Sequence, residues 1–107
     1  RRPGMTSIKR QQQRHLKAIG HKLKPVLTIA NNGLTDNVLI ELERALNDHE
    51  LVKLKVSVGR RELRDTLIDE LGERSGAEVV QRVGNTALLL RRSHDPDPRL
   101  SNLMRRV

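Results

Sequence analysis

The chain has 107 residues, a length that fits one domain, and its 36% of hydrophobic residues is enough for one modest core. The absence of cysteine excludes disulfides, thiolate metal sites and cysteine nucleophiles, and the absence of Phe, Trp and Tyr excludes base stacking on aromatic rings. No apolar run approaches the roughly 20 residues that a membrane span needs. The formal net charge of +8 indicates an anionic partner.

The excess positive charge lies in the first third of the chain. Residues 1–35 hold eight basic residues and no acidic one, whereas the rest of the chain holds 13 of each sign. This asymmetry favours a nucleic-acid-binding face, with an organelle transit peptide or a solvated face without a partner as the alternatives. No secretory signal is visible, so we expect a cytoplasmic protein. Residues 1–6 are interpreted as an N-terminal extension, in which residues 1–4 precede Met5 and could be an expression remnant.

Residues 7–21 are expected to form a helix that Gly20 ends. Ile8, Leu16 and Ile19 fall near one apolar stripe, and Leu23 continues it. Basic side chains spaced by four, three and four residues lie on the opposite face of this helix. The basic residues of this face and of the segment after it are Arg10, Arg14, Lys17, His21, Lys22 and Lys24.

An extended run follows Pro25, and its β-branched residues predict a strand over 26–30. Residues 31–33, Asn-Asn-Gly, form a tight connection, and Thr35 or Asp36 is expected to cap the next helix, which ends at 47–49. In residues 51–58 four valines and leucines alternate with Lys53, Lys55 and Ser57. This alternation predicts a half-buried strand with a basic outer face.

The remaining elements are a third helix over 61–75, with Leu63, Leu67, Ile68 and Leu71 on its apolar side, and two strands at about 78–83 and 86–91. Gly84-Asn85 is a two-residue hairpin signal between these strands. The order α-β-α-β-α-β-β predicts an α/β fold with a mixed sheet whose closing hairpin is antiparallel. Residues 93–107 contain two prolines and are expected to be a flexible or loosely docked tail.

A phosphate-binding site is expected where the first strand leads through Asn31-Asn32-Gly33 into the second helix. The first backbone N–H groups of a helix lack intrahelical partners and carry the positive end of its dipole. Glycine allows close approach of a nucleic-acid backbone, and the two asparagine amides can donate hydrogen bonds. Such a segment is more often a plain turn, but its place in the acid-free third of the chain favours binding. Lys53 and Lys55 would extend the basic surface if their side of the sheet is open, and otherwise they are covered or merely solvated.

Several short motifs occur in one order along residues 7–92: QQQRHL at 11–16, LKPV at 23–26, NGLT at 32–35, AL at 45–46, HELVK at 49–53, GAEVVQ at 76–81 and GNTALLL at 84–90. In these motifs the chain resembles the CRM domain family (chloroplast RNA splicing and ribosome maturation), and in particular its bacterial stand-alone YhbY-like members. The resemblance implies a compact domain with a four-stranded mixed sheet, related to the C-terminal domain of translation initiation factor 3 and to KH-like folds. It also implies RNA binding through a GxxG loop and, for the stand-alone members, association with precursors of the large ribosomal subunit.

The loop departs from the pattern of the family it resembles, which is Gly, a basic residue, Asn and Gly. Here the loop is Ala30-Asn31-Asn32-Gly33, so one expected phosphate contact is missing. We therefore expect the basic residues of the first helix to carry more of the affinity. The full set of expected RNA-binding residues is Arg10, Arg14, Lys17, His21, Lys22, Lys24, Ala30, Asn31, Asn32, Gly33, Lys53 and Lys55.

The expected function is docking on structured ribosomal RNA, in association with large-subunit precursors and their assembly. The four histidines are scattered without metal-ligand spacing, and no phosphate-binding or nucleophile motif of an enzyme is present. We therefore expect no catalysis, cofactor, metal site, membrane contact or small-molecule substrate, and we expect a monomer. Two alternatives stay open: a general DNA-binding or nucleoid protein, and a protein-interaction module of the assembling ribosome.

Overall fold

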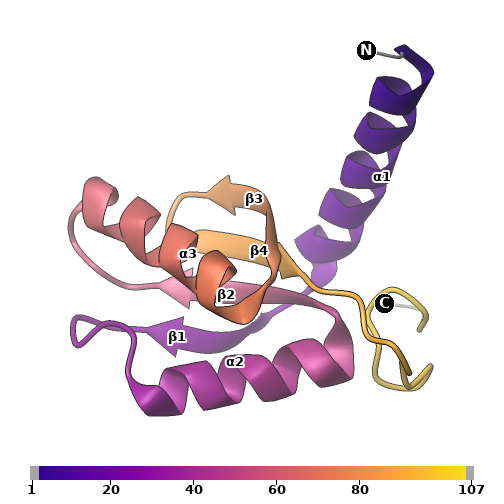
Figure 1. Cartoon of the computed structure of the whole chain (residues 1–107). Coiled ribbons are helices and arrows are strands. Elements are labelled where there is room, and N and C mark those ends of the chain that lie inside the picture. Colours follow the sequence, from indigo (N-terminus) through magenta and orange to yellow (C-terminus); the bar gives the residue numbers. More distant parts are fainter. Residues whose placement is uncertain (1–2, 106–107) are drawn as a thin grey trace.

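The computed structural model describes residues 3–105, with side chains from Arg10 onward, and shows three helices and four strands in the predicted order (Figure 1). The elements are α1 (Pro3–Lys22), β1 (Pro25–Ile29), α2 (Asp36–His49), β2 (Leu51–Val56), α3 (Arg61–Ser75), β3 (Glu78–Val83) and β4 (Thr86–Leu90). The strands form one sheet in the order β1-β2-β4-β3. β1 and β2 are parallel and both other pairs are antiparallel, so the predicted α/β fold with a mixed sheet is confirmed.

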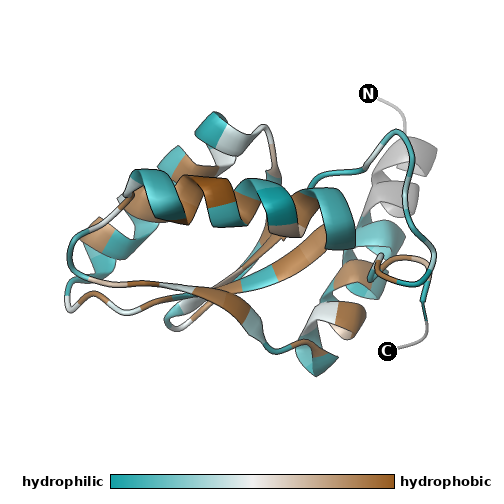
Figure 2. Ribbon diagram, turned by 90° about the horizontal axis from the view of Figure 1, so that it is seen from below, coloured by the Kyte–Doolittle hydropathy of each residue, from teal (hydrophilic) through white to brown (hydrophobic). Residues whose placement is uncertain are grey.

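Alternation along β2 divides the core between the two faces of the sheet. Val52, Leu54 and Val56 are fully buried in the larger cluster, which α2 and α3 cover with Leu42, Leu46 and Leu71 among others. The smaller cluster lies on the opposite face, where Leu16 of α1 packs with Leu51, Val80, Leu88 and Leu90. Figure 2 shows the apolar stretches along the strands behind α2, interrupted by hydrophilic residues.

The second and third helices have the bounds that the sequence predicts, and local signals mark the start of α2 and the end of α3. The hydroxyl of Thr35 accepts a hydrogen bond from the backbone N–H of Val38 at 3.2 Å and caps α2. Gly76 ends α3 in the left-handed conformation, with φ of 72°. Leu63 is a correction: it was expected on the apolar side of α3 but is 45% exposed. It lies in the first turn of α3, one turn before the buried Leu67, and is not among the residues that pack on the larger cluster.

The first helix is longer than predicted at both ends. It begins at Pro3, within the segment interpreted as an extension, and continues past Gly20 to Lys22. The side chain of Ile8 lies outside the part that the structure describes, whereas Leu16, Ile19 and Leu23 pack on the sheet as predicted. Gly20 is buried because α1 crosses β4 there. A Cβ atom at Gly20 would lie 2.5 Å from Cδ2 of Leu88, so this glycine permits close packing and does not end the helix.

The C-terminal segment, residues 93–105, packs against the start of β2. The sequence predicts a tail that is either flexible or loosely docked, and the described residues are docked. The physical reason is Glu50, which is 4% exposed and whose carboxylate accepts hydrogen bonds from the Ser101 hydroxyl and the Ser93 backbone N–H, each at 2.6 Å. Asn102 adds a side-chain hydrogen bond from its Nδ2 to the Leu51 carbonyl at 2.7 Å. The segment forms turns without a regular helix.

Arg91, directly after β4, connects that strand to α2 and α3 through hydrogen bonds, and one of its partners makes the stability of the fold depend on pH in acid. Its guanidinium donates two hydrogen bonds of 2.8 Å to the Glu43 carboxylate, and others to Asn47 and to the Ser75 carbonyl. The hydrogen bond from Arg91 holds the pKa of Glu43 below its ordinary value of 4.5. A lowered folded-state pKa contributes stability above the unfolded-state value, and this contribution is lost as the pH falls through the folded-state pKa.

We therefore expect the free energy of unfolding to decrease below a pH of about 4.5, with a smaller decrease in Glu43→Gln. Urea denaturation of both proteins across this range is the measurement, with Glu41→Gln as the control for an exposed carboxylate on the same helix. Equal acid dependence in wild type and Glu43→Gln would contradict a role for this ion pair.

Candidate nucleic-acid interface

The C-terminal half of α1 crosses the sheet, and its basic residues surround the point of crossing. Leu16 and Gly20 face the sheet and are buried, whereas Arg10, Arg14 and His21 are exposed and Lys17 is half-buried. Figure 1 shows the N-terminal turns of α1 extending away from the sheet. α1 has no acidic residue along its length. Its exposed side therefore presents positive charge without compensation from its own carboxylates.

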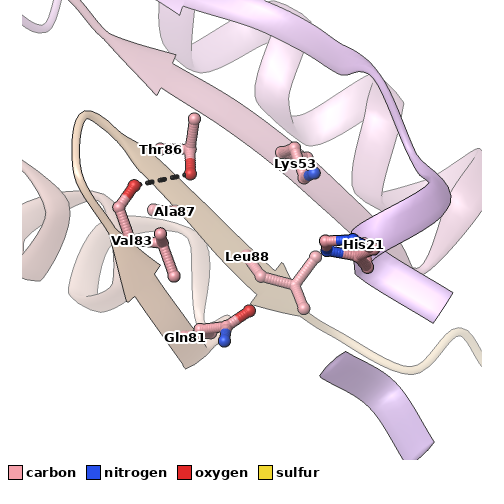
Figure 3. Close-up of a pocket in the computed structure, with 7 residues that line it drawn as sticks. All are labelled: His21, Lys53, Gln81, Val83, Thr86, Ala87 and Leu88. Atoms are coloured by element: carbon pink, nitrogen blue, oxygen red, sulfur yellow. Dashed lines mark hydrogen bonds between the residues drawn. The ribbon is translucent and has the colours of Figure 1, made fainter. Parts of the chain in front are cut away.

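Lys53 and Lys55 lie on the side of the sheet that α1 only partly covers. Lys53 lines a hollow with His21 of α1 and with Gln81, Val83, Thr86 and Leu88 of the hairpin (Figure 3). Figure 3 shows His21 and Lys53 on one side of the hollow and Gln81 on the other. Lys55 is exposed two residues further along β2, between Thr28 of β1 and Thr86 of β4. The side of the sheet that carries both lysines is therefore open to solvent, as their predicted role in binding requires. They extend the positive charge of α1 along the sheet.

Lys22 and Lys24 lie on another side of the α1 terminus. They line a groove with Val26 and His49, to which the docked tail contributes Asn102 and Arg105. Neither lysine forms an ion pair with a carboxylate among the residues whose side chains are described. The end of α1 is therefore flanked by cations on two sides, which concentrates positive potential where the helix meets the sheet.

The loop after β1 is a tight turn held by its own backbone. The Gly33 N–H donates to the Ala30 carbonyl at 2.9 Å, and the Thr35 N–H donates to the Gly33 carbonyl at 3.1 Å. Ala30, Asn31 and Asn32 are exposed, so both asparagine amides are accessible to a ligand. Thr35 then caps α2, whose first N–H groups carry the positive end of the helix dipole.

The structure separates this loop from the basic cluster of α1. The loop and α1 lie at opposite ends of β1 (Figure 1), and a strand of five residues spans about 16 Å. Lys53 and Lys55 of the neighbouring strand run between these ends. The predicted residues therefore lie in sequence along the sheet. The basic residues of α1 are at one end, Lys53 and Lys55 are in the middle, and Asn31 and Asn32 are at the other end.

Gly33 has a φ of +71°, a backbone conformation that costs most residues about 1–2 kcal/mol. Space is not limiting, because a Cβ atom at this position would meet nothing closer than Cδ2 of Leu67 at 3.9 Å. We expect Gly33→Ala to lower the free energy of unfolding by about 1 kcal/mol and Gly33→Asn to lower it less, since asparagine tolerates this conformation. Urea denaturation of both variants tests the expectation, which wild-type stability in Gly33→Ala would contradict.

A group of arginines that the sequence does not predict as part of the site lies at the same end of the sheet as the loop. Arg60, Arg61 and Arg64 lie at the start of α3, and none forms an ion pair within the described side chains. The ends of β1 and β2 are joined by a hydrogen bond of 2.7 Å from the Ser57 N–H to the Ile29 carbonyl. The parallel pairing of β1 and β2 is the signal that could have identified these arginines, because the segments that follow two parallel strands lie at the same edge of the sheet.

The described residues contain no group of three or more histidine and acidic side chains that could hold a metal ion. None of the helices, within the range that the structure describes, is both long and apolar enough to cross a membrane. His49 makes a structural contact, in which its Nδ1 lies 2.8 Å from the carbonyl oxygen of Leu100 in the tail.

Comparison with known proteins shows which family the chain resembles. A protein of Pseudomonas aeruginosa named "probable RNA-binding protein" is 48% identical over 92% of this chain and 95% of its own length. An RNA-binding protein of Haemophilus influenzae is 40% identical over 85% of this chain and 92% of its own length. The solution structure of a hypothetical protein from Staphylococcus aureus, proposed to bind RNA, superposes with a TM-score of 0.70 at 26% identity, covering 79% of this chain and 88% of that one. The model of the CRS1/YhbY (CRM) domain matches residues 8–91, and the chain therefore belongs to the CRS1/YhbY (CRM) domain family.

Proposed function

We propose that the protein binds structured RNA through backbone phosphates. The proposal rests on a cationic cluster around the end of α1, which Lys53 and Lys55 continue over the sheet. The members of this cationic cluster, none of which forms an ion pair within the described side chains, are Arg10, Arg14, Lys17, Lys22 and Lys24. Phosphate contacts supply most sequence-independent affinity for nucleic acids. Membership in a family whose relatives are named RNA-binding proteins supports RNA as the nucleic acid.

Recognition by shape is favoured over recognition by base stacking. The chain has no Phe, Tyr or Trp, so the open side of the sheet lacks the large aromatic rings on which other RNA-binding sheets stack bases. That side instead presents Lys53, Lys55, Thr28, Thr86 and Gln81, whose polar groups suit phosphates and ribose hydroxyls. In this proposal the protein is a non-catalytic binding module that acts as a monomer without a cofactor.

The first test compares an RNA hairpin with a DNA hairpin of the same sequence at matched salt. We expect tighter binding to RNA and an affinity that falls by orders of magnitude from about 50 to about 200 mM salt. Equal or tighter binding to DNA would favour a nucleoid protein. The absence of salt-dependent binding to either hairpin would contradict the proposal.

We further propose that the RNA is ribosomal and belongs to a precursor of the large subunit. Support comes from the resemblance to the stand-alone YhbY-like proteins. Sedimentation of a tagged copy from cell lysate, with and without RNase, tests this step. Migration with large-subunit precursors that RNase abolishes is expected. RNase-resistant migration would favour a protein-interaction module, and the absence of the protein from all ribosomal fractions would contradict the assignment.

A further inference from the structure

The groove beside Lys22 and Lys24 is completed by the C-terminal tail. Arg105 and Asn102 of the tail line this groove together with Lys22, Lys24, Val26 and His49, and Val26 is exposed. No carboxylate lines the groove within the described part of the chain. The tail is thus positioned to add a third cation to a groove that already contains two.

The position of Arg105 is set by a series of hydrogen bonds that leads into the core. Its Nε donates to Oδ1 of Asn102 at 3.0 Å, and its backbone N–H donates to the Ser101 carbonyl at 2.9 Å. Asn102 is in turn held by hydrogen bonds to the carbonyls of Leu51 and His49, at 2.7 and 2.9 Å. Ser101 is fully buried against the carboxylate of Glu50. The base of the Arg105 side chain is therefore anchored.

The nearby negative charge of Glu50 is already used inside the fold. Its two oxygens accept the hydrogen bonds from Ser93 and Ser101, and the residue is 4% exposed. Glu50 also has a φ of +62°, a conformation that a non-glycine residue adopts at a cost in free energy. Within the described residues, the terminal nitrogens of Arg105 form no hydrogen bond. They are thus available to a ligand in the groove.

We infer that the groove formed by Lys22, Lys24 and Arg105 binds a phosphate of the RNA backbone, and that the docked tail is part of the RNA-binding surface. This inference rests on the proposed function. It adds a phosphate site that needs Arg105 of the tail as well as the basic residues of α1 and the segment after it. Arg105 supplies a planar donor fork, which suits bidentate contact with a phosphodiester. The two lysines that line the same groove supply point charges.

Arg105→Ala is the direct test, with Arg99→Ala as the matched control. Both changes remove one arginine from the tail, but Arg99 is 87% exposed, pairs with Asp97 and lies outside the groove. The probe is a fluorescein-labelled RNA hairpin, followed by anisotropy over a salt series. We expect Arg105→Ala to weaken binding about three- to tenfold and to lower the salt slope by about one, with little change in Arg99→Ala.

A double variant tests whether Arg105 and Lys24 contact the same phosphate. If they do, Lys24→Ala with Arg105→Ala loses less affinity than the product of the two single losses. Equal losses in Arg105→Ala and Arg99→Ala would overturn the inference, because they would reflect net charge alone. In that case tight, salt-dependent binding by the wild type leaves the proposed function intact. A wild type that does not bind the hairpin overturns both.

Discussion

Replacing Lys17, Lys22 and Lys24 together with alanine is expected to weaken binding to an RNA hairpin by roughly 10- to 100-fold at physiological salt. These lysines flank the crossing of α1 over the sheet, and two of them line the groove with Arg105. Each lost phosphate contact lowers the salt slope by about 0.9, so the slope should fall by about two to three. The fold should persist, because Lys22 and Lys24 are exposed and Lys17 is only half-buried.

The control for this variant carries the same loss of charge elsewhere. Arg44 on α2, Arg74 on α3 and Arg99 in the tail are exposed, and the last two pair with Glu70 and Asp97. Their combined replacement with alanine should change the affinity much less than the lysine variant does. An equal effect in both triple variants would contradict a localised binding surface and would leave only long-range attraction by net charge.

Gly20→Ala is expected to destabilise the protein, although alanine normally stabilises a helix by about 1 kcal/mol relative to glycine. The new methyl group would lie 2.5 and 2.7 Å from the two terminal carbons of Leu88, which is 3% exposed. Overpacking of this kind costs about 1–3 kcal/mol, and a shift of α1 that relieves it would also displace the cationic cluster. We therefore expect a melting temperature lower by about 4–8 °C for each 1 kcal/mol of net loss, together with weaker RNA binding.

Gly59→Ala is the matched control for Gly20→Ala, because a Cβ atom at Gly59 would have no neighbour within 4 Å. Its melting temperature should stay close to that of the wild type. Combining Gly20→Ala with Leu88→Ala should cost less than the sum of the two single changes, since the shortened side chain makes room for the new methyl group. A Gly20→Ala variant as stable as the wild type would show that Leu88 adjusts without cost.

The elements that the sequence predicts well are those with local signals. Thr35 marks the start of α2, Gly76 marks the end of α3, and the alternation in residues 51–58 marks a strand buried on one side. The Gly84-Asn85 signal places the hairpin turn correctly, with Gly84 at a φ of +58°. In each case neighbouring residues determine the backbone conformation, so one sequence is enough.

The features that the sequence did not predict depend on contacts between distant segments. Glycine often ends a helix, so Gly20 resembles a helix end in the sequence. Its role in close packing follows only from the contact with Leu88, 68 positions away. In the sequence Glu50 resembles an ordinary surface carboxylate. It is buried because the tail folds back and places Ser93 and Ser101 in hydrogen bonds with its carboxylate. The proximity of Arg60 to the loop after β1 likewise follows from the parallel pairing of β1 and β2.

The candidate site shows the same division between local and distant information. Sequence spacing selected the basic side of α1 and the alternating Lys53 and Lys55. It did not indicate that the asparagine loop lies a full strand length from α1, or that the tail supplies Arg105 to the groove. These relations depend on the strand order and on the docked tail, which no local pattern in the sequence encodes.

The most direct test of the RNA-binding surface is amide chemical-shift mapping of the isotope-labelled protein during titration with an RNA hairpin. We expect shift changes concentrated in residues 10–24, at Lys53 and Lys55 and in residues 101–105, with smaller changes in the loop at 30–33. The outer side of α2, around Ile40 and Arg44, should stay unchanged. Shift changes centred on that side of α2, with none around the end of α1, would contradict RNA binding by the end of α1 and the open side of the sheet.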